Sequence, residues 1–132
     1  MTARRTIAEY MATELATLAP DMEINHAMVL LLERGISGAP VVSASGELLG
    51  VLSKKDCLRA ALHATYHQEL GGVVADYMNQ DVQTLEADLD IVEGAEVFLK
   101  SAYRRFPVMS EGRLVGQISR ADLLRALAEQ WQ

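Results

Sequence analysis

Residues 49–56 read LGVLSKKD, and residues 115–122, which lie 66 positions later, read VGQISRAD. Each stretch passes from an apolar segment bearing a glycine directly into Ser-x-x-Asp. That order is typical of a β-strand that ends where a capped helix begins. Because the same transition occurs twice, the sequence predicts a duplicated unit of strands and helices. This repeat decides the predicted fold, and further matches between the two copies lie on both sides of it in the sequence.

The repeat covers nearly all of the 132 residues. Up to Ser43 the two copies align at an offset of 67, and after a turn that is one residue longer in the first copy they align at 66. The positions of the first copy that are identical in the second are Ala8, Tyr10, Met11, Thr17, Leu18, Asp21, Ile24, Leu32, Pro40, Val41, Ser43, Gly46, Leu48, Gly50, Ser53, Asp56, Leu58, Arg59 and Ala60. We expect a first repeat with a linker helix over residues 1–67 and a second repeat over 68–132.

Each copy is predicted to hold a short leading helix, a brief strand, a helix, a two-stranded hairpin and a closing helix. The expected ranges are 7–11, 15–18, 24–34, 39–52 and 54–67 in the first copy, and 74–78, 82–85, 90–101, 106–118 and 120–130 in the second. Gly35 is placed to end a helix, and Asp90 with Glu93 resembles a capping box that begins one. Gly50 and Gly116 indicate a bulge or a close backbone approach. The predicted fold class is α/β (α+β), with two pseudo-symmetric β-α-β-β-α repeats packed sheet to sheet and helices outside.

Composition and charge restrict the classes of partner. The chain has 18 acidic and 12 basic residues, a net charge of −6. Because phosphate neutralisation dominates nucleic-acid binding, an acidic chain without a basic run argues against a nucleic-acid partner. No apolar run approaches the roughly 20 residues that span a bilayer, which argues against a membrane partner. A single cysteine and the lack of a secretory signal predict a cytoplasmic location.

The repeated Ser-x-x-Asp has two interpretations. In the first, Ser53 and Ser119 cap the closing helices, and Asp56 and Asp122 complete capping boxes. In the second, the same helix start binds a ligand, because its free N–H groups and partial positive charge suit a phosphate. The carboxylate one turn further on is suited to accept hydrogen bonds from two ribose hydroxyls. The motif alone favours the cap.

The order of the motifs adds a resemblance. A Pro-Val strand, a hairpin, a glycine-bearing strand and Ser-x-x-Asp, repeated after some 66 residues, resemble the CBS domain (named from cystathionine β-synthase). Two in tandem form a Bateman module. The resemblance rests on residues 35–42 with 49–56 and on residues 104–108 with 114–122, and it covers about residues 7–127. No single element is specific, but the ordered pair is.

The resemblance implies an adenosine-containing ligand, such as AMP, ADP, ATP or S-adenosylmethionine, in the cleft between the repeats. It implies that the aspartates hold ribose, the serines touch phosphate, the threonines of the first strands meet the base, and the residues before each proline form the pocket wall. The resemblance also implies that a site can combine the Ser-x-x-Asp of one copy with the wall of the other. The candidate ligand-binding residues are Thr17, Ser37, Gly38, Ala39, Pro40, Ser53, Lys54, Asp56, Thr84, Arg104, Arg105, Phe106, Pro107, Ser119, Arg120 and Asp122.

The two candidate walls differ in charge. The second copy has Arg104 and Arg105 where the first has Ser37 and Gly38. Arginines can fork onto phosphate oxygens, although solvated surface is the alternative interpretation. We therefore predict one stronger site, which uses the arginine pair with residues 119–122, and one weaker or empty site in the first copy.

Other chemistry has little support. His63 and His67 have a metal-binding spacing on a predicted helix, but no third ligand lies close in sequence, so no metal is expected. Cys57 aligns with Leu123, which indicates a small core residue. No glycine-rich phosphate loop is present. An enzyme that uses one of these side chains for metal or redox chemistry is only a third hypothesis, and no enzymatic activity is expected.

The predicted function is a regulatory ligand sensor that signals to a separate effector protein. A homodimer is expected by analogy with the family. The alternative is a dimerisation or docking module whose sites are vestigial and whose Ser-x-x-Asp motifs serve only as caps.

Overall fold

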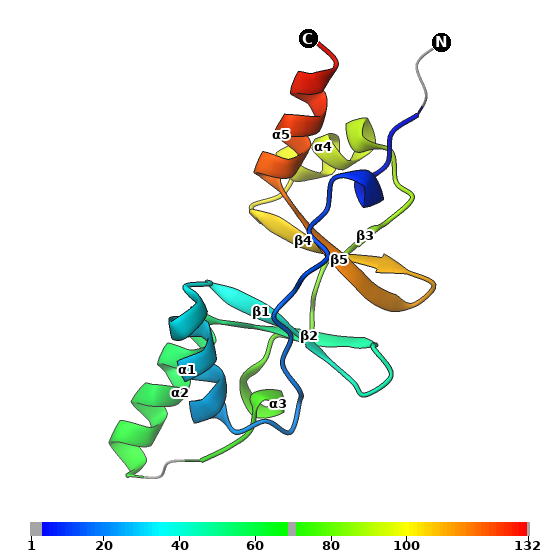
Figure 1. Ribbon diagram of the computed structural model, residues 1–132. Helices are drawn as coiled ribbons and strands as arrows, with labels where there is room; N and C mark the ends of the chain where they lie inside the picture. Colours follow the sequence, from blue (N-terminus) through cyan, green and yellow to red (C-terminus); the bar gives the residue numbers. More distant parts are fainter. Residues whose placement is uncertain (1–3, 69–70, 132) are drawn as a thin grey trace. The chain divides into compact units, whose positions relative to one another are not determined.

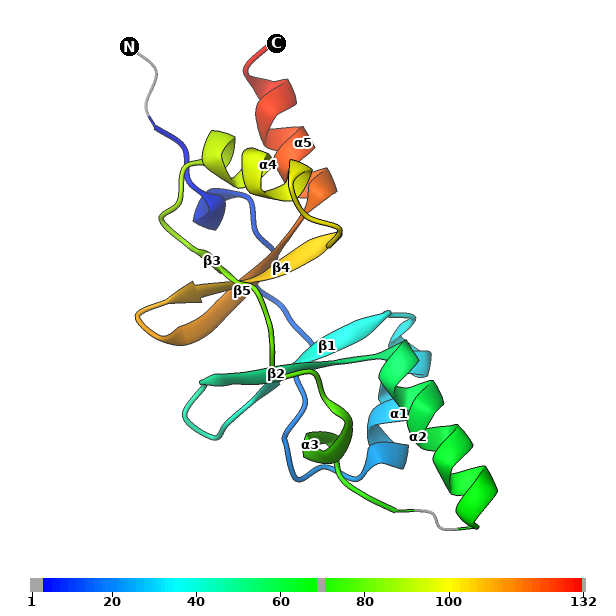
Figure 2. The ribbon, with the colours of Figure 1, turned by 180° about the vertical axis from the view of Figure 1, so that it is seen from behind.

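The computed structural model describes residues 4–68 and 71–131 (Figures 1 and 2). The helices and strands are η1 (Ile7–Glu9), α1 (Ile24–Arg34), β1 (Gly38–Val42), β2 (Leu48–Ser53), α2 (Lys54–His67), α3 (Val74–Tyr77), β3 (Leu85–Glu86), α4 (Ile91–Leu99), β4 (Arg105–Ser110), β5 (Arg113–Ser119) and α5 (Arg120–Glu129). The chain divides into two compact units. Residues 16–82 form the first-hairpin unit. The segment up to Leu15, together with the segment from Gln83 onward, forms the second-hairpin unit.

The first-hairpin unit is built on an antiparallel pair, β1 and β2, with α1 and α2 side by side against it (Figure 1). Leu18 extends this sheet in parallel beside β1, since its amide donates to Pro40 O (2.9 Å) and its carbonyl accepts from the Val42 amide (2.9 Å). On α1 the buried residues are three or four positions apart, the spacing of a helix with one apolar face. The core residues are Leu18, Ile24, Ala27, Leu31, Ala39, Val41, Leu52, Cys57, Ala60 and Val74.

The second-hairpin unit repeats this arrangement. Strands β4 and β5 are antiparallel, β3 lies parallel to β4, and α4 and α5 pack against the sheet (Figure 2). Leu85 is opposite Val108, the same pairing that Leu18 makes with Val41 in the other unit. The core residues are Ile7, Leu85, Ile91, Phe98, Phe106, Val108, Ile118, Leu123 and Ala126. The mixed helix-and-strand repeat that the sequence predicts is confirmed.

The helix boundaries follow local chemistry. Helix α1 ends at Gly35, whose φ of 62° lies in the left-handed region that glycine adopts without penalty. The bounds of α1 and α2 are those predicted from the sequence. Helix α4 begins after Asp90, whose side chain accepts from the Val92 amide (3.0 Å). The helix that Asp90 was expected to begin is therefore present, but among the described residues Glu93 does not complete the predicted capping box, and Asp90 acts through a single hydrogen bond.

The leading segments of the two repeats are exchanged between the units. Ile7, in the first repeat, is fully buried in the core of the second-hairpin unit, and Ala12 exchanges two backbone hydrogen bonds with Gln117 of β5 (2.8 and 2.9 Å). Asn79, in the second repeat, does the same with Val51 of β2 (both 2.9 Å). Each unit therefore holds the leading segment of one sequence repeat and the hairpin of the other.

Two glycines make this exchange possible. A Cβ atom on Gly50 would lie 2.7 Å from Asn79 O, and one on Gly116 would lie 2.8 Å from Ala12 O. Both distances are too short for any side chain, so the leading segment can approach the strand only at glycine. The close backbone approach predicted at Gly50 and Gly116 is confirmed.

The predicted strand over residues 15–18 is wrong. Only Leu18 is paired there, and in the second repeat the strand is Leu85–Glu86 instead of residues 82–85. Residues 13–17 lie between the bridge of Ala12 to one sheet and the bridge of Leu18 to the other, where the chain passes from one unit to the next. Within the described part of the chain this stretch has no partner strand. Among the described residues, no helix combines the length and the apolar character that a bilayer crossing needs.

Candidate site at the strand-to-helix junctions

The hairpins bring the two parts of the predicted site together within each unit. Gly38 is opposite Ser53, and the Lys54 amide donates to Ser37 O (2.9 Å). In the second-hairpin unit Arg105 is opposite Ser119, and the Arg120 amide donates to Arg104 O (3.2 Å). In both units the residues before the proline therefore lie beside the Ser-x-x-Asp of the same copy.

A complete capping box begins α2. Asp56 Oδ2 accepts hydrogen bonds from the Ser53 amide (2.9 Å) and from Ser53 Oγ (2.8 Å), while Ser53 Oγ accepts from the Asp56 amide (3.1 Å). Asp56 is only 9% exposed. The other carboxylate oxygen, Oδ1, accepts from Arg59 Nη1 at 3.2 Å. Both oxygens of this carboxylate thus have partners within the protein.

The start of α5 has nearly the same geometry. Asp122 Oδ2 accepts from the Ser119 amide (2.9 Å), Ser119 Oγ accepts from the Asp122 amide (3.2 Å), and Arg125 donates to Asp122 Oδ1 (3.3 Å). One difference stands out. Among the residues that the structure describes, Ser119 Oγ makes no second hydrogen bond, whereas Ser53 Oγ donates to its own aspartate. The hydroxyl proton of Ser119 is therefore free to be donated to a ligand.

Charge distinguishes the two junctions. Arg104, Arg105 and Arg120 are exposed at the start of α5, and we call them the arginine cluster. Within residues 4–68 and 71–131 none of the three forms an ion pair. The corresponding positions at the start of α2 are Ser37, Gly38 and Lys54. Lys55 adds a second exposed cation at the start of α2, so the start of α5 has three arginines against two lysines, and the partial charge of the helix N-terminus adds to each.

The remaining predicted residues are placed as follows. Thr17 is exposed and precedes Leu18, and Thr84 is half-buried and precedes β3. Ala39 and Phe106 have side chains in the two cores, and Phe106 is 1% exposed, with its ring 4.7 Å from that of Phe98. These two positions offer a ligand only their backbones. Pro40 is buried and Pro107 is half-buried.

Two arginines were missed by the sequence reasoning. Arg59 and Arg125 hold the second oxygens of the two aspartates. The signal was available, because these residues are identical in the two repeats and lie three positions after each aspartate, which is one helical turn.

Other reactive side chains are accounted for by packing or exposure. Cys57 lies in the core, as predicted, and its burial, together with the Asp56 carboxylate beside it, raises the pKa of the thiol. The rings of His63 and His67 are 4.4 Å apart on the exposed side of α2. Among the described residues no group of three potential metal ligands occurs.

Comparison with known proteins identifies relatives over most of the chain. The MJ1225 protein of Methanocaldococcus jannaschii is 30% identical over 125 residues, which is 95% of this chain and 44% of the relative. An A-adding tRNA nucleotidyltransferase of Aquifex aeolicus is 32% identical over 93% of this chain, but only 14% of that enzyme is covered. The chain thus spans less than half the length of these two relatives.

Solved structures share the fold. CBSX2 of Arabidopsis thaliana, solved in complex with AMP, has a TM-score of 0.80 and 25% identity, with 96% of this chain and 98% of that chain covered. The CBS domain pair of MJ0100, solved with methylthioadenosine and S-adenosylmethionine, has a TM-score of 0.73 and 20% identity, with 97% and 99% covered. At that lower identity the likeness shows the fold alone.

The family itself matches the chain twice, once for each repeat. The CBS domain covers residues 7–63 and again residues 74–129. These two matches include both hairpins, both Ser-x-x-Asp motifs and both leading segments. The chain belongs to the CBS domain family and carries two CBS domains in tandem.

Proposed function

We propose that this CBS pair is a regulatory module that binds an adenosine-containing, phosphorylated ligand and transmits its occupancy to a separate effector protein. AMP, ADP and ATP are the preferred candidates, and S-adenosylmethionine is the alternative. The observation that carries the proposal is the arginine cluster at the N-terminus of α5, beside the free hydroxyl of Ser119. No reaction is proposed, and the predicted cytoplasmic location stays a prediction.

The physical argument concerns charge. Three exposed arginines, which form no ion pair among the described residues, repel one another, and they lie at the N-terminus of a ten-residue helix, whose dipole adds partial positive charge. A phosphate relieves this repulsion and accepts hydrogen bonds from the guanidinium groups and from Ser119. The start of α2 has two lysines, Lys54 and Lys55, and no arginine at the positions of Arg104 and Arg105, so it lacks the planar guanidinium groups that bind phosphate through two hydrogen bonds. We propose that the site at α5 is the stronger one and that the site at α2 is weak or empty.

The adenosine part of the proposal has separate support. CBSX2, which has the same fold and 25% identity, was solved with AMP. In our proposal Asp122 binds the ribose in exchange for its contact with Arg125, and Thr84 lies near the base. The location between the repeats, and any contribution from the other copy, remain predictions from the family resemblance.

Signalling requires two states with different ligand affinity. A ligand can shift an equilibrium only by the difference between its affinities for the two states. We propose that the module works as a homodimer and that ligand binding changes its association or its contact with the effector. The apolar side chains that both helix pairs expose, including Leu32, Leu58, Leu99 and Leu124, support this association.

A ligand panel tests the proposal. AMP, ADP, ATP, S-adenosylmethionine, NADH and adenosine are titrated by calorimetry and compared in thermal unfolding. A ligand present at ~100 times its Kd should add about 2.7 kcal/mol to the free energy of unfolding. We expect the phosphorylated compounds to bind more tightly than adenosine. No response to any compound at millimolar concentration would refute the proposal.

Matched variants locate the site. Removal of Arg104 and Arg105 (Arg104→Ala with Arg105→Ala) should weaken AMP binding by roughly 10- to 100-fold, as expected for the loss of charge-assisted hydrogen bonds. The control is Arg113→Ala, which removes one arginine at the opposite end of the same hairpin, where Arg113 pairs with Ser110. Equal AMP affinity in the double variant and the control would contradict a phosphate site at the cluster.

A second candidate function is a docking module with vestigial sites. The capping boxes favour it, because they give both serines and both aspartates a structural role without any ligand. Under this alternative Asp122→Ala should lower stability by about 1 kcal/mol or less and leave all affinities unchanged. Under the sensor proposal the same substitution abolishes nucleotide binding while the fold remains.

A further inference from the structure

One arginine of α5 bridges the candidate site and the leading segment of the first repeat. Arg125 Nη2 donates hydrogen bonds to Asp122 Oδ1 and to the backbone carbonyl of Tyr10, both at 3.3 Å. This nitrogen carries two hydrogens, so one atom serves both acceptors. Asp122 belongs to the candidate site, and Tyr10 belongs to residues 7–12, which we call the N-terminal leading segment. Arg125 therefore connects the site and the segment directly.

The same tyrosine is also bonded near the far end of α5. The Tyr10 hydroxyl donates to Glu129 Oε2 (2.8 Å) and accepts from Arg5 Nη1 (2.7 Å). Because Arg125 and Glu129 are four positions apart, they lie on one face of the helix. Tyr10 thus contacts two successive turns of α5, one through its carbonyl and the next through its hydroxyl.

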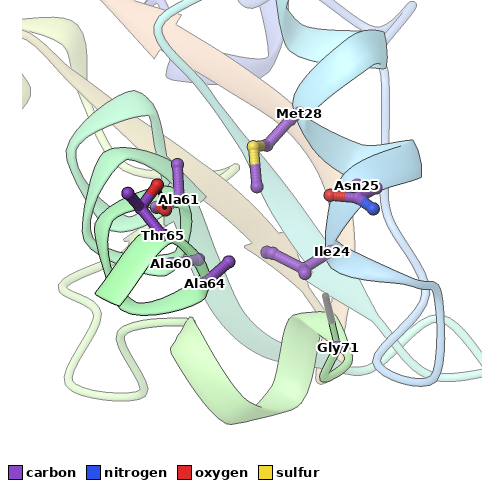
Figure 3. Close-up of a pocket in the computed structure, with 8 residues that line it drawn as sticks. All are labelled: Ile24, Asn25, Met28, Ala60, Ala61, Ala64, Thr65 and Gly71. Atoms are coloured by element: carbon purple, nitrogen blue, oxygen red, sulfur yellow. Dashed lines mark hydrogen bonds between the residues drawn. The ribbon is translucent and has the colours of Figure 1, made fainter. Parts of the chain in front are cut away.

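The equivalent arginine of the first-hairpin unit makes no such bridge. Arg59 Nη1 donates to Asp56 Oδ1 (3.2 Å), and among the described residues it has no other hydrogen bond. The chain also enters the two leading segments differently. Gly72 stands where the other unit has Arg5, and its neighbour Gly71 lines a hollow between α1 and α2 (Figure 3). Within the part of the chain that the structure describes, only the unit with the arginine cluster has side-chain hydrogen bonds between its closing helix and its leading segment.

We propose that Arg125 couples occupancy of the site at α5 to the N-terminal leading segment. A ligand whose ribose hydroxyls take the Asp122 carboxylate removes the partner that orients Arg125, and the bond to Tyr10 O weakens. This inference rests on the proposed function and adds how occupancy is transmitted from the site. Arg125 is a positioning residue, because it acts on the segment and not on the ligand.

The direction of the effect follows from the two partners of Arg125. Hydrogen bonds between ionised groups are roughly twice as strong as those between neutral groups, so the Asp122 carboxylate is the stronger partner and the Tyr10 carbonyl the weaker one. The Arg125 side chain is 56% exposed. Without its carboxylate this guanidinium gains rotamer freedom in solvent, and a single neutral acceptor does not offset the loss of that freedom. Release of Asp122 therefore loosens the leading segment.

Amide hydrogen exchange tests the coupling in the ligand-bound chain. AMP is added to saturation, as judged by calorimetry, and exchange is followed by NMR at the amides of Ala8, Met11 and Ala12, which all donate to backbone carbonyls. We expect these amides to exchange roughly 2- to 10-fold faster with AMP than without it, the range expected for the loss of one hydrogen bond. A ligand that only stabilises the fold slows exchange instead. Unchanged or slower exchange in residues 7–12 with AMP bound would overturn the inference.

Matched substitutions in the two repeats test the coupling without ligand. Asp122→Asn keeps the shape of the cap but removes the charge that holds Arg125, so we expect the same 2- to 10-fold faster exchange in residues 7–12. Asp56→Asn is the control, because Arg59 makes no bond to a leading segment among the described residues. It should change exchange in residues 74–79 by less than twofold. Equal acceleration in the two variants would assign the effect to the cap and contradict the bridge.

Removal of the bridge itself separates the coupling from the ligand proposal. In Arg125→Gln, exchange in residues 7–12 should already be fast and should not rise further when AMP saturates this variant, whereas Arg59→Gln should keep the wild-type response. A full response to AMP in Arg125→Gln contradicts the coupling and leaves the ligand proposal standing. A wild-type chain that binds no AMP at millimolar concentration contradicts the ligand proposal, and the comparison of Asp122→Asn with Asp56→Asn still decides the coupling.

Discussion

The substitution of Gly116 by alanine tests the exchange of leading segments most directly. A Cβ at this position would lie 2.8 Å from Ala12 O, which is a backbone atom and cannot rotate away. The leading segment must then separate from β5, and the two hydrogen bonds between Ala12 and Gln117 are lost. At about 1 kcal/mol for each bond, with another ~1 kcal/mol for displaced packing of Met11, we expect a loss of about 3 kcal/mol in the free energy of unfolding.

Urea unfolding followed by far-UV circular dichroism measures this loss as a lower transition midpoint. Gly71→Ala is the matched control, because no atom lies within 4 Å of the added Cβ there. It should change stability by no more than about 0.5 kcal/mol. If Gly116→Ala unfolds at the same urea concentration as Gly71→Ala, the leading segment is not held against β5 and the reasoning is refuted.

Three further predictions concern single side chains. Tyr10→Phe should cost about 1 kcal/mol in urea unfolding, because the Tyr10 hydroxyl accepts from Arg5 (2.7 Å) and donates to Glu129 (2.8 Å). Tyr77→Phe, the same change in the other repeat, should be neutral, and an equal loss in both would contradict this. Burial and the Asp56 carboxylate raise the pKa of the Cys57 thiol, so Cys57 should react slowly with Ellman's reagent at neutral pH. Because the unfolded chain loses this proton at a lower pH than the folded chain, the thiol should leave the free energy of unfolding unchanged below about pH 8.5. It should lower that free energy as the pH rises from there through the folded-state pKa. Gly35→Ala should cost about 1–2 kcal/mol, measured by thermal unfolding, because its φ is 62°.

Local sequence signals predicted most of the helices and hairpins. Helix α2 begins after Ser53 because the Ser-x-x-Asp side chains satisfy its first N–H groups, and α1 ends at Gly35 because glycine adopts the left-handed conformation. These signals act over a few residues and can be read without knowledge of the fold. The hairpin positions follow for the same reason.

The exchange between units could not be predicted from the same signals. Ile7 and Val74 occupy equivalent positions in the repeats, so a core that accepts one accepts the other. The sequence pattern is identical whether a leading segment packs on its own hairpin or on the hairpin of the other copy. Gly50 and Gly116 showed that a backbone approaches closely, but not which backbone.

The candidate site was predicted in part. The register that sets Arg105 opposite Ser119 follows from the hairpin, and the sequence placed both residues in one site. The predicted role of Phe106 as wall is limited to its backbone, because its ring packs on Phe98 in the core. Successive side chains of a strand point to opposite faces of the sheet. The sequence alone does not decide which face is the buried one, so only the structure settles which residues of the wall point to solvent.

The duplicated motif cannot itself decide between a sensor and a docking module. Both aspartates are fully used by a capping box and an arginine, so a protein that needed only stable helices would keep the same Ser-x-x-Asp. What the cap does not explain is the difference between the two junctions. Arg104, Arg105 and Arg120 raise the positive charge at one helix start without acidic partners among the described residues, which a purely structural role would disfavour. The asymmetry between the repeats, more than their likeness, is therefore the argument for an anionic ligand.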